Sequence, residues 1–153
     1  MSNDYDNITA YHYSAYRPAL HLPILESCLE GKYFEKGLDI GCGTGHSSIA
    51  LANFCNEIVG LEPSSDMLTK TIFDKKVNYL HWDAKKLPFP NFYFEIVTLA
   101  GSWYYGQSQY LLDEITRVTR TGGKVLLYDF NIVLNEVLRL LNIPNAESSY
   151  NHQ

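Results

Sequence analysis

Three glycines at alternate positions, Gly41, Gly43 and Gly45, carry the clearest chemical signal of this chain. The apolar segment 37–40 runs into them, and the apolar helix-forming segment 49–52 follows soon after. Glycine tolerates positive φ and has no Cβ, so such a turn lets the backbone approach a ligand closely. The helix that follows directs backbone N–H groups toward the same ligand. The order of strand, glycine turn and helix predicts a nucleotide-like ligand on a parallel sheet.

Two carboxylates are expected at the same edge of that sheet. Glu62 follows the strand segment 57–61 and comes 21 positions after Gly41 (62 − 41). A carboxylate there can accept both hydroxyls of a ribose, as the acidic residue of dinucleotide-binding folds does. Asp83, beyond the third strand, can accept from an adenine amino group while the Ala84 N–H meets a ring nitrogen. The alternatives remain open: an exposed loop carboxylate for Glu62, and a turn or N-cap residue for Asp83.

Strands and helices alternate along the chain, which favours an α/β fold with a mostly parallel, helix-covered sheet. We expect one domain over 1–153, with an irregular arm at 1–16 and a polar tail at 143–153. Gly122 and Gly123 are expected to end the helix before the last strand. The expected elements are helix 17–29, strand 36–40, helix 45–54, strand 57–61, helix 64–73, strand 77–81, strand 94–100, helix 107–119, strand 124–130 and helix 132–142.

The composition limits the classes of function. Apolar residues make up 46% of the 153 and charged residues 19%, values typical of a soluble globular domain. The net charge of −5 and the lack of a dense basic patch argue against a nucleic-acid-binding protein. Three cysteines without C-x-x-C spacing argue against a disulfide framework or a metal site. With no signal peptide or membrane-spanning run expected, we predict a cytoplasmic protein.

The ordered set of motifs resembles class I S-adenosylmethionine-dependent methyltransferases of the small-molecule, methyltransferase type 11-like group. The matching segments are 38–45 (Leu-Asp-Ile-Gly-Cys-Gly-Thr-Gly), 59–64, 83–84 with 87–90, 94–97, and 117–118 with 122–126. The resemblance covers residues 12–130, approximately. It implies a Rossmann-like three-layer sandwich with strand order 3-2-1-4-5. Because the chain ends soon after the fifth strand, we expect it to lack the usual C-terminal strands 6 and 7.

The resemblance also implies the ligands and the residues that bind them. S-adenosyl-L-methionine would be the cofactor and S-adenosyl-L-homocysteine the product. Residues 39–45 would surround the methionine part, Glu62 would bind the ribose, and residues 83–84 the adenine. An N-terminal arm would fold over the cofactor. The implied cofactor-binding residues are Tyr16, Arg17, Asp39, Gly41, Cys42, Gly43, Thr44, Gly45, Glu62, Pro63, Ser64, Met67, Asp83, Ala84, Ala100, Gly101 and Trp103.

The implied reaction is in-line methyl transfer to a small-molecule acceptor. The positive sulfur activates the methyl carbon, so the protein must hold the acceptor on the S–CH₃ axis and exclude water. A protein base is required only where the acceptor must lose a proton. His46, Tyr104 and Tyr105 are the candidates, with a helix-surface role as the alternative for His46 and a pocket-wall role for the tyrosines.

Three other functions compete with this interpretation. An NAD-dependent oxidoreductase would carry G-x-G-x-x-G, but His46 occupies the place of the third glycine. A nucleic-acid methyltransferase would carry an Asn-Pro-Pro-Tyr-like motif after segment 94–100, where this chain has Ala-Gly-Ser-Trp. A truncated or inactive cofactor-binding core that works through a partner remains open. Strand 124–130 would then be an exposed edge, and helix 132–141 is apolar nearly all round, so either could mediate a homodimer.

Overall fold

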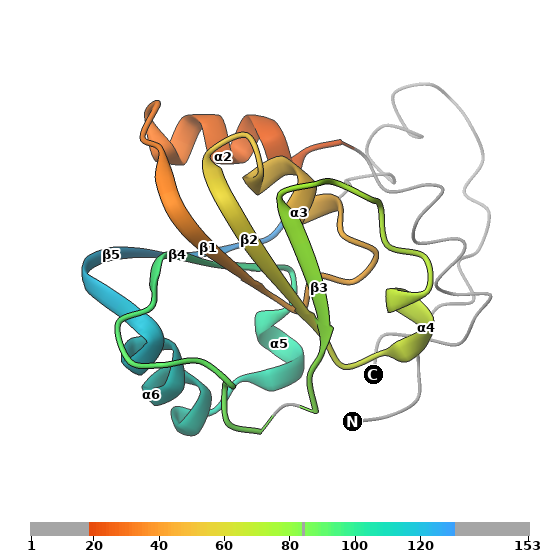
Figure 1. The fold of residues 1–153 in the computed structure, drawn as a ribbon, viewed down its shortest axis with the longest axis vertical. Coiled ribbons are helices and arrows are strands. Elements are labelled where there is room, and N and C mark those ends of the chain that lie inside the picture. Colours follow the sequence, from red (N-terminus) through yellow and green to blue (C-terminus); the bar gives the residue numbers. More distant parts are fainter. Residues whose placement is uncertain (1–18, 84, 131–153) are drawn as a thin grey trace, which may run out of the picture.

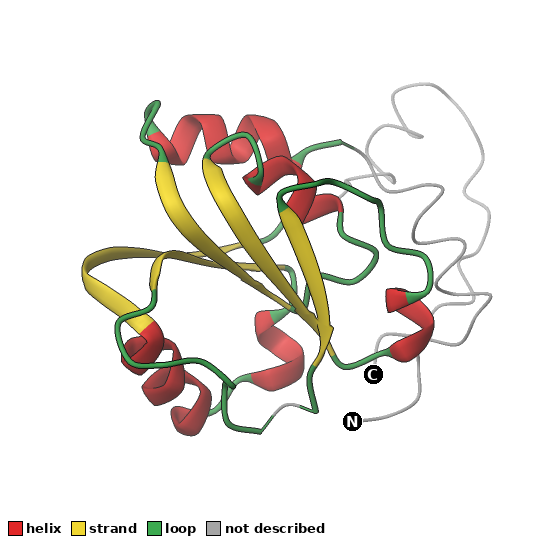
Figure 2. Ribbon diagram, in the orientation of Figure 1, coloured by secondary structure: helices red, strands yellow, loops and turns green. Residues whose placement is uncertain are grey.

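The structure, a computed structural model, describes residues 19–83 and 85–130 of the chain. Its five strands form one sheet in the order β3-β2-β1-β4-β5, and all four strand pairs are parallel. Helices cover both faces of the sheet (Figures 1 and 2). The strands are β1 (Phe34–Ile40), β2 (Cys55–Glu62), β3 (Val77–His81), β4 (Phe94–Ala100) and β5 (Thr119–Tyr128). These observations confirm the expected Rossmann-like fold and its strand order.

The helices lie in two layers on either side of the sheet. In Figure 1, α2 and α3 lie above the sheet, and α5 and α6 lie below it. The helices of the described residues are α2 (His21–Leu29), α3 (His46–Leu51), α4 (Ser65–Leu68), α5 (Trp103–Gly106) and α6 (Gln109–Val118). The expected arm 1–16, helix 132–142 and tail 143–153 lie outside the described residues.

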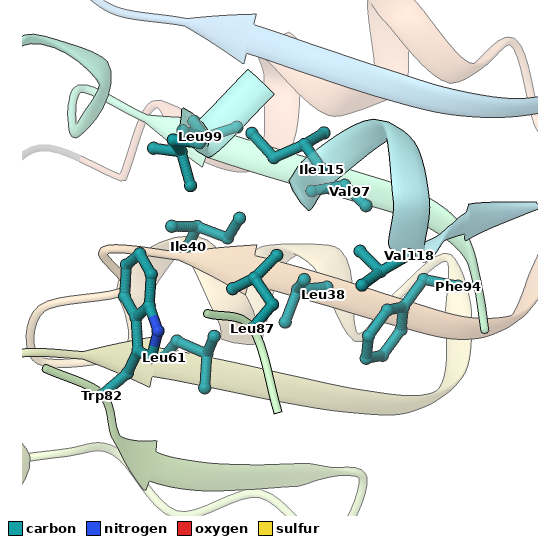
Figure 3. Close-up of a cluster of buried hydrophobic side chains, with 11 residues drawn as sticks. Leu38, Ile40, Leu61, Trp82, Leu87, Phe94, Val97, Leu99, Ile115 and Val118 are labelled. Carbon is teal, nitrogen blue, oxygen red and sulfur yellow. The ribbon is translucent and has the colours of Figure 1, made fainter. Parts of the chain in front are cut away.

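Each face of the sheet has its own apolar core. Successive strand residues point to opposite faces, so Ile96 packs under α2 and α3 while Val97 packs against α6. Figure 3 shows the core on the α6 side of the sheet, where Trp82 and Leu87 from the loop after β3 pack beside the strands. A sheet buried on both faces requires nearly continuous apolar strands. The run Phe-Glu-Ile-Val-Thr-Leu-Ala of β4 meets that requirement, and four of its seven residues belong to one core or the other.

The expected elements differ from the observed ones mainly in the helices. Strands β3 and β4 have the predicted bounds, and β1 and β2 begin two residues before the predicted ones. Helices α2 and α3 are shorter than expected, and α4 ends at Leu68 rather than at Phe73. Helix α5 lies in a segment that we expected to be a loop. Short helices such as α4 and α5 depend on tertiary contacts more than on their own propensity.

The prediction that Gly122 and Gly123 end a helix is wrong. Helix α6 already ends at Val118, and β5 begins at Thr119, three residues before this glycine pair begins. Thr119 pairs with Phe94 and Lys124 with Ile96, so residues 120–123 bulge out of the strand pairing. Gly122 has a φ of 77°, a left-handed conformation that glycine adopts without strain. The glycines therefore form a bulge within β5.

A partly buried ion pair fastens the loop between β3 and β4. Arg117 of α6 donates to the carbonyl oxygens of Leu87 (2.9 Å) and Phe89 (2.7 Å). It also pairs with Glu114 at 2.7 Å, and Glu114 accepts from the Leu87 N–H at 2.8 Å. The hydrogen bond from Arg117 holds the pKa of Glu114 below its ordinary value. These contacts fix the path of the loop that begins at Asp83.

The burial of Leu38 predicts how much a cavity in the core would lower the free energy of unfolding. Leu38 is fully buried between α6 and the sheet, whereas Leu112 on α6 is 38% exposed. We expect Leu38→Ala to lower the free energy of unfolding by about 3 kcal/mol, because removing the buried isopropyl group of the side chain leaves a cavity. The control, Leu112→Ala, is expected to change it by less than about 1 kcal/mol. Urea unfolding measures both, and equal losses would contradict the assignment of Leu38 to the core.

Candidate functional site

The carboxyl ends of the strands are joined by backbone hydrogen bonds. The N–H groups of Gly41 and Cys42 donate to the carbonyl oxygen of Leu61 at 2.8 and 3.0 Å. The Gly101 N–H donates to the carbonyl oxygen of Tyr128 at 2.8 Å. The segments that leave β1 and β4 therefore begin in contact with β2 and β5. This is the edge at which open α/β sheets bind ligands.

All three glycines of the run adopt a left-handed conformation, as expected for Gly41 and Gly43, whereas Gly45 was expected only to allow close packing of helix and strand. Their φ values are 71°, 56° and 94° for Gly41, Gly43 and Gly45. A Cβ at Gly41 would overlap the side chain of Ser102, whose hydroxyl donates to the Ile40 carbonyl oxygen at 2.6 Å. Beside Gly41, the space that a Cβ would occupy is therefore taken by the segment after β4. The glycine is required for the close approach of two protein segments.

Asp39 lies beneath the glycine run and is fully buried. Its Oδ2 accepts from the hydroxyls of Ser47 and Ser48, both at 2.6 Å, and its Oδ1 accepts from Thr98 at 2.8 Å. Burial raises the pKa of Asp39, and the three hydroxyl donors partly offset that effect. The carboxylate joins β1 to α3 and β4. This geometry favours a role in holding the glycine run in place.

Glu62 connects the glycine run to the segment after β2. Its Oε2 accepts from the Gly43 N–H at 2.9 Å, and its Oε1 accepts from the Ser64 N–H at 2.8 Å. The side chain is 7% exposed, and burial raises its pKa above the ordinary value despite the two backbone donors. A carboxylate oxygen can accept more than one hydrogen bond. Each oxygen of Glu62 therefore has capacity for a further donor besides its backbone contact, and ribose binding stays a prediction.

The other predicted residues after β2 lie in the short segment that follows Glu62 and in α4. Ser64 caps α4, and its Oγ accepts from the Met67 N–H at 3.3 Å. Met67 is buried, and the Pro63 carbonyl oxygen accepts from His81 Nε2 at 3.0 Å. The resemblance implies that Pro63, Ser64 and Met67 lie near the adenosine, and this role stays a prediction.

Asp83 has a different environment from that expected. Its exposed carboxylate pairs with Lys85 at 3.1 Å and accepts from the Lys85 N–H at 3.3 Å. The hydrogen bond from the Lys85 side chain holds the pKa of Asp83 below its ordinary value. This is the geometry of the turn residue that the sequence left open as an alternative. Ala84 lies outside the described residues, so adenine binding by this pair stays a prediction.

The predicted residues on the acceptor side are placed at the ends of β1 and β4. Ala100 is buried, Gly101 has a φ of 65°, and Trp103 packs against the apolar core. Tyr104 is 72% exposed, and His46 Nδ1 lies 3.1 Å from the hydroxyl of Thr44.

Of the other predicted cofactor-binding residues, Cys42 is buried, and burial raises the pKa of its thiol. Tyr16, Arg17 and the side chain of Tyr105 lie outside the described residues.

A pair of ionisable side chains that sequence reasoning missed, His21 and Tyr128, also lies at this edge. His21 Nδ1 is 3.0 Å from the hydroxyl of Tyr128, and the His21 ring also packs edge-on against Phe130. His21 is buried at the start of α2, and the backbone of Tyr128 contacts Gly101. The two residues are 107 positions apart in the chain. The only indication available from the sequence was the expected strand order, which places Tyr128 at the end of β5, beside the end of β4.

Within the described residues, no three His, Cys, Asp or Glu side chains are grouped so as to hold a metal ion. In the same part of the chain, no helix has the length and apolar character needed to cross a membrane.

Known proteins match this fold and these motifs. A family model described as a methyltransferase domain matches residues 38–127. A curated demethylmenaquinone methyltransferase from Bacillus cereus is 38% identical over 101 residues, which cover 60% of this chain and 43% of the relative. The chain thus spans less than half the length of the curated relatives that it matches.

Solved structures agree with the architecture. One from Methanococcus maripaludis, assigned as an S-adenosyl-L-methionine-dependent methyltransferase, has a TM-score of 0.74 at 21% identity and covers 92% of this chain and 74% of that one. Another, from Haloferax volcanii, was solved as a complex between the Trm112 methyltransferase activator and a protein assigned as a methyltransferase. It has a TM-score of 0.63 at 22% identity and covers 71% of this chain and 51% of that one. At such identities the likeness shows the fold.

The raised pKa of Glu62 predicts a pH dependence of stability. Its stabilising contribution is fully present below the unfolded pKa of about 4.3 and is lost as the pH rises through the raised folded pKa. We expect Glu62→Gln to remove this loss, so that the variant gains stability relative to the wild type between about pH 4 and pH 7. Urea unfolding across that range measures the difference. A difference that does not change with pH would contradict the prediction, and Glu57→Gln, on the exposed part of the same strand, controls for loss of a charge.

Proposed function

Because the chain belongs to the methyltransferase-domain family, we propose that it transfers a methyl group from S-adenosyl-L-methionine to a small-molecule acceptor. The observation that carries this proposal is the Glu62 carboxylate, buried between the glycine run and the segment after β2. An acidic side chain at the end of the second strand binds ribose hydroxyls in related sheets. Both oxygens of Glu62 are oriented by backbone N–H groups from the two segments that would flank a nucleoside.

The residues at this edge fit such a cofactor. Glu62 would accept the ribose hydroxyls, with Pro63, Ser64 and Met67 beside the adenosine and residues 41–45 around the methionine part. Ala100 and Gly101 would border the reacting sulfur, and we assign the adenine to Asp83 as a further proposal. When bound, S-adenosyl-L-methionine supplies a methyl carbon that is already activated by its positive sulfur. The protein's own task is to orient the acceptor and to exclude water.

The acceptor is proposed to be a small molecule. One curated relative is named as a demethylmenaquinone methyltransferase, which supports this class of acceptor. The net charge of −5 and the lack of a dense basic segment favour it over a nucleic acid. The three free cysteines support a reducing, cytoplasmic location. His46, Tyr104 and Tyr105 remain the candidate bases for an acceptor that must lose a proton.

A second candidate function is that of a cofactor-binding core that acts through a partner. Val125 and Leu127 on the outer strand β5 are 40% and 47% exposed. The chain also spans only 43% of its curated relative, and one solved neighbour was captured with an activator protein. A second copy docked on β5 would cover these side chains. Light scattering that gives twice the mass of one chain would support this candidate, and a monomer with full methylation activity would contradict it.

Cofactor binding tests the proposed function directly. We expect the protein to bind S-adenosyl-L-homocysteine in isothermal titration calorimetry and to gain no stability from NADH. Glu62→Gln should weaken binding about tenfold or more, because hydrogen bonds to a charged group contribute about 1.5–3 kcal/mol. Glu57→Gln, which removes an exposed carboxylate from the same strand, serves as the matched control. Stabilisation by NADH without any binding of S-adenosyl-L-homocysteine would overturn the proposal.

A further inference from the structure

Tyr79 of β3 occupies a space left open by two glycines from different elements. Gly60 of β2 pairs directly with Tyr79, and a Cβ at Gly60 would lie 2.8 Å from the ring carbon Cδ1. A Cβ at Gly45, the last glycine of the run, would lie 2.8 Å from Cζ and would overlap the hydroxyl. Protein interiors pack closely enough that neither methyl group could be accommodated. The tyrosine ring thus extends from β3, across β2, to the end of the glycine run.

The hydroxyl of Tyr79 ties a further segment to this place. It donates to the Ile72 carbonyl oxygen at 2.9 Å, and the Ile72 N–H donates to the Thr44 carbonyl oxygen at 3.1 Å. Segment 69–76, which leads from α4 to β3 (Figure 1), is thereby fastened to the glycine run. Burial raises the pKa of Tyr79, so the hydroxyl remains a donor at neutral pH.

Apolar burial holds the middle of segment 69–76 only weakly. Phe73 is 89% exposed and Ile72 is 38% exposed. The two hydrogen bonds at Ile72 therefore account for much of its attachment. Thr44, by contrast, is 1% exposed, and its neighbour Gly43 donates to Glu62. A displacement of the backbone at Thr44 would therefore also displace Gly43 and weaken its hydrogen bond to Glu62, on which the proposed function depends.

We propose that Tyr79 is a positioning residue of the cofactor site, which fixes the glycine run by fastening segment 69–76 to Thr44. This role rests on the proposed function, since it assumes that the glycine run holds S-adenosyl-L-methionine. Tyr79 contributes no atom to the reaction. Its effect passes from the hydroxyl through Ile72 to Thr44, and from there to Gly43 and Glu62.

The test compares two tyrosine hydroxyls at opposite ends of the sheet. Tyr79→Phe removes the bond to Ile72, and Tyr93→Phe, just before β4, removes a bond of 3.1 Å that the hydroxyl accepts from Lys36 of β1. We expect Tyr79→Phe to weaken binding of S-adenosyl-L-homocysteine about three- to fivefold and to speed exchange of the Ile72 amide proton. Tyr93→Phe should leave both unchanged. Calorimetry, amide exchange and urea unfolding on the whole chain give these readouts.

The outcomes separate the two proposals. If the wild type binds and Tyr79→Phe binds equally well, the role of Tyr79 is overturned while the proposed function stands. If both variants weaken binding equally, with equal loss of stability, the effect is global and the role is again overturned. If the wild type does not bind S-adenosyl-L-homocysteine, the proposed function fails. The amide of Ile72 then shows whether Tyr79 fastens the segment for structural reasons alone, a result that also overturns a positioning role.

Discussion

The carboxylate of Asp39 lies entirely away from solvent, and the rest of the site depends on how it is satisfied. A buried ionisable group is costly unless hydrogen bonds replace its water. Three hydroxyls do so here, two from α3 and one from Thr98 of β4. Both ends of the glycine run are thereby fixed, because Asp39 precedes the run and Ser47 follows it. Strand β4 is held in the same arrangement, so three elements meet at a single side chain.

Glu62 repeats this arrangement closer to the surface, with backbone N–H groups in place of hydroxyls. Asp39 accepts from three protein hydroxyls and is fully buried, whereas Glu62 accepts from two backbone N–H groups and is 7% exposed. The first carboxylate is therefore suited to holding the scaffold, and the second keeps acceptor capacity for a ligand. Two acidic residues at the ends of neighbouring strands thus have different chemistry, which their side-chain type alone does not reveal.

The parts of the fold that could be predicted are those with local signals. The strand bounds of β3 and β4, the glycine conformations and the position of Glu62 all follow from runs of residues read in order. The start of β5 could not be predicted, because Gly122 and Gly123 look like a helix end and serve instead in a bulge. Helix α5, with the sequence Trp-Tyr-Tyr-Gly, has little helix propensity, and its Trp103 packs on the core. The contacts of Tyr79 and Asp83 depend on neighbours brought by the fold.

The contact between His21 and Tyr128 also constrains the order in which the chain can fold. Helix α2 is among the first described elements in the sequence, yet its first residue is held by the last residue of β5. Central strand β1 likewise gains its second neighbour only when β4 arrives. Contacts between such distant residues carry a large loop-closure entropy and slow folding. During synthesis from the N-terminus, the carboxyl edge of the sheet can therefore close only after nearly all of the described chain has been made.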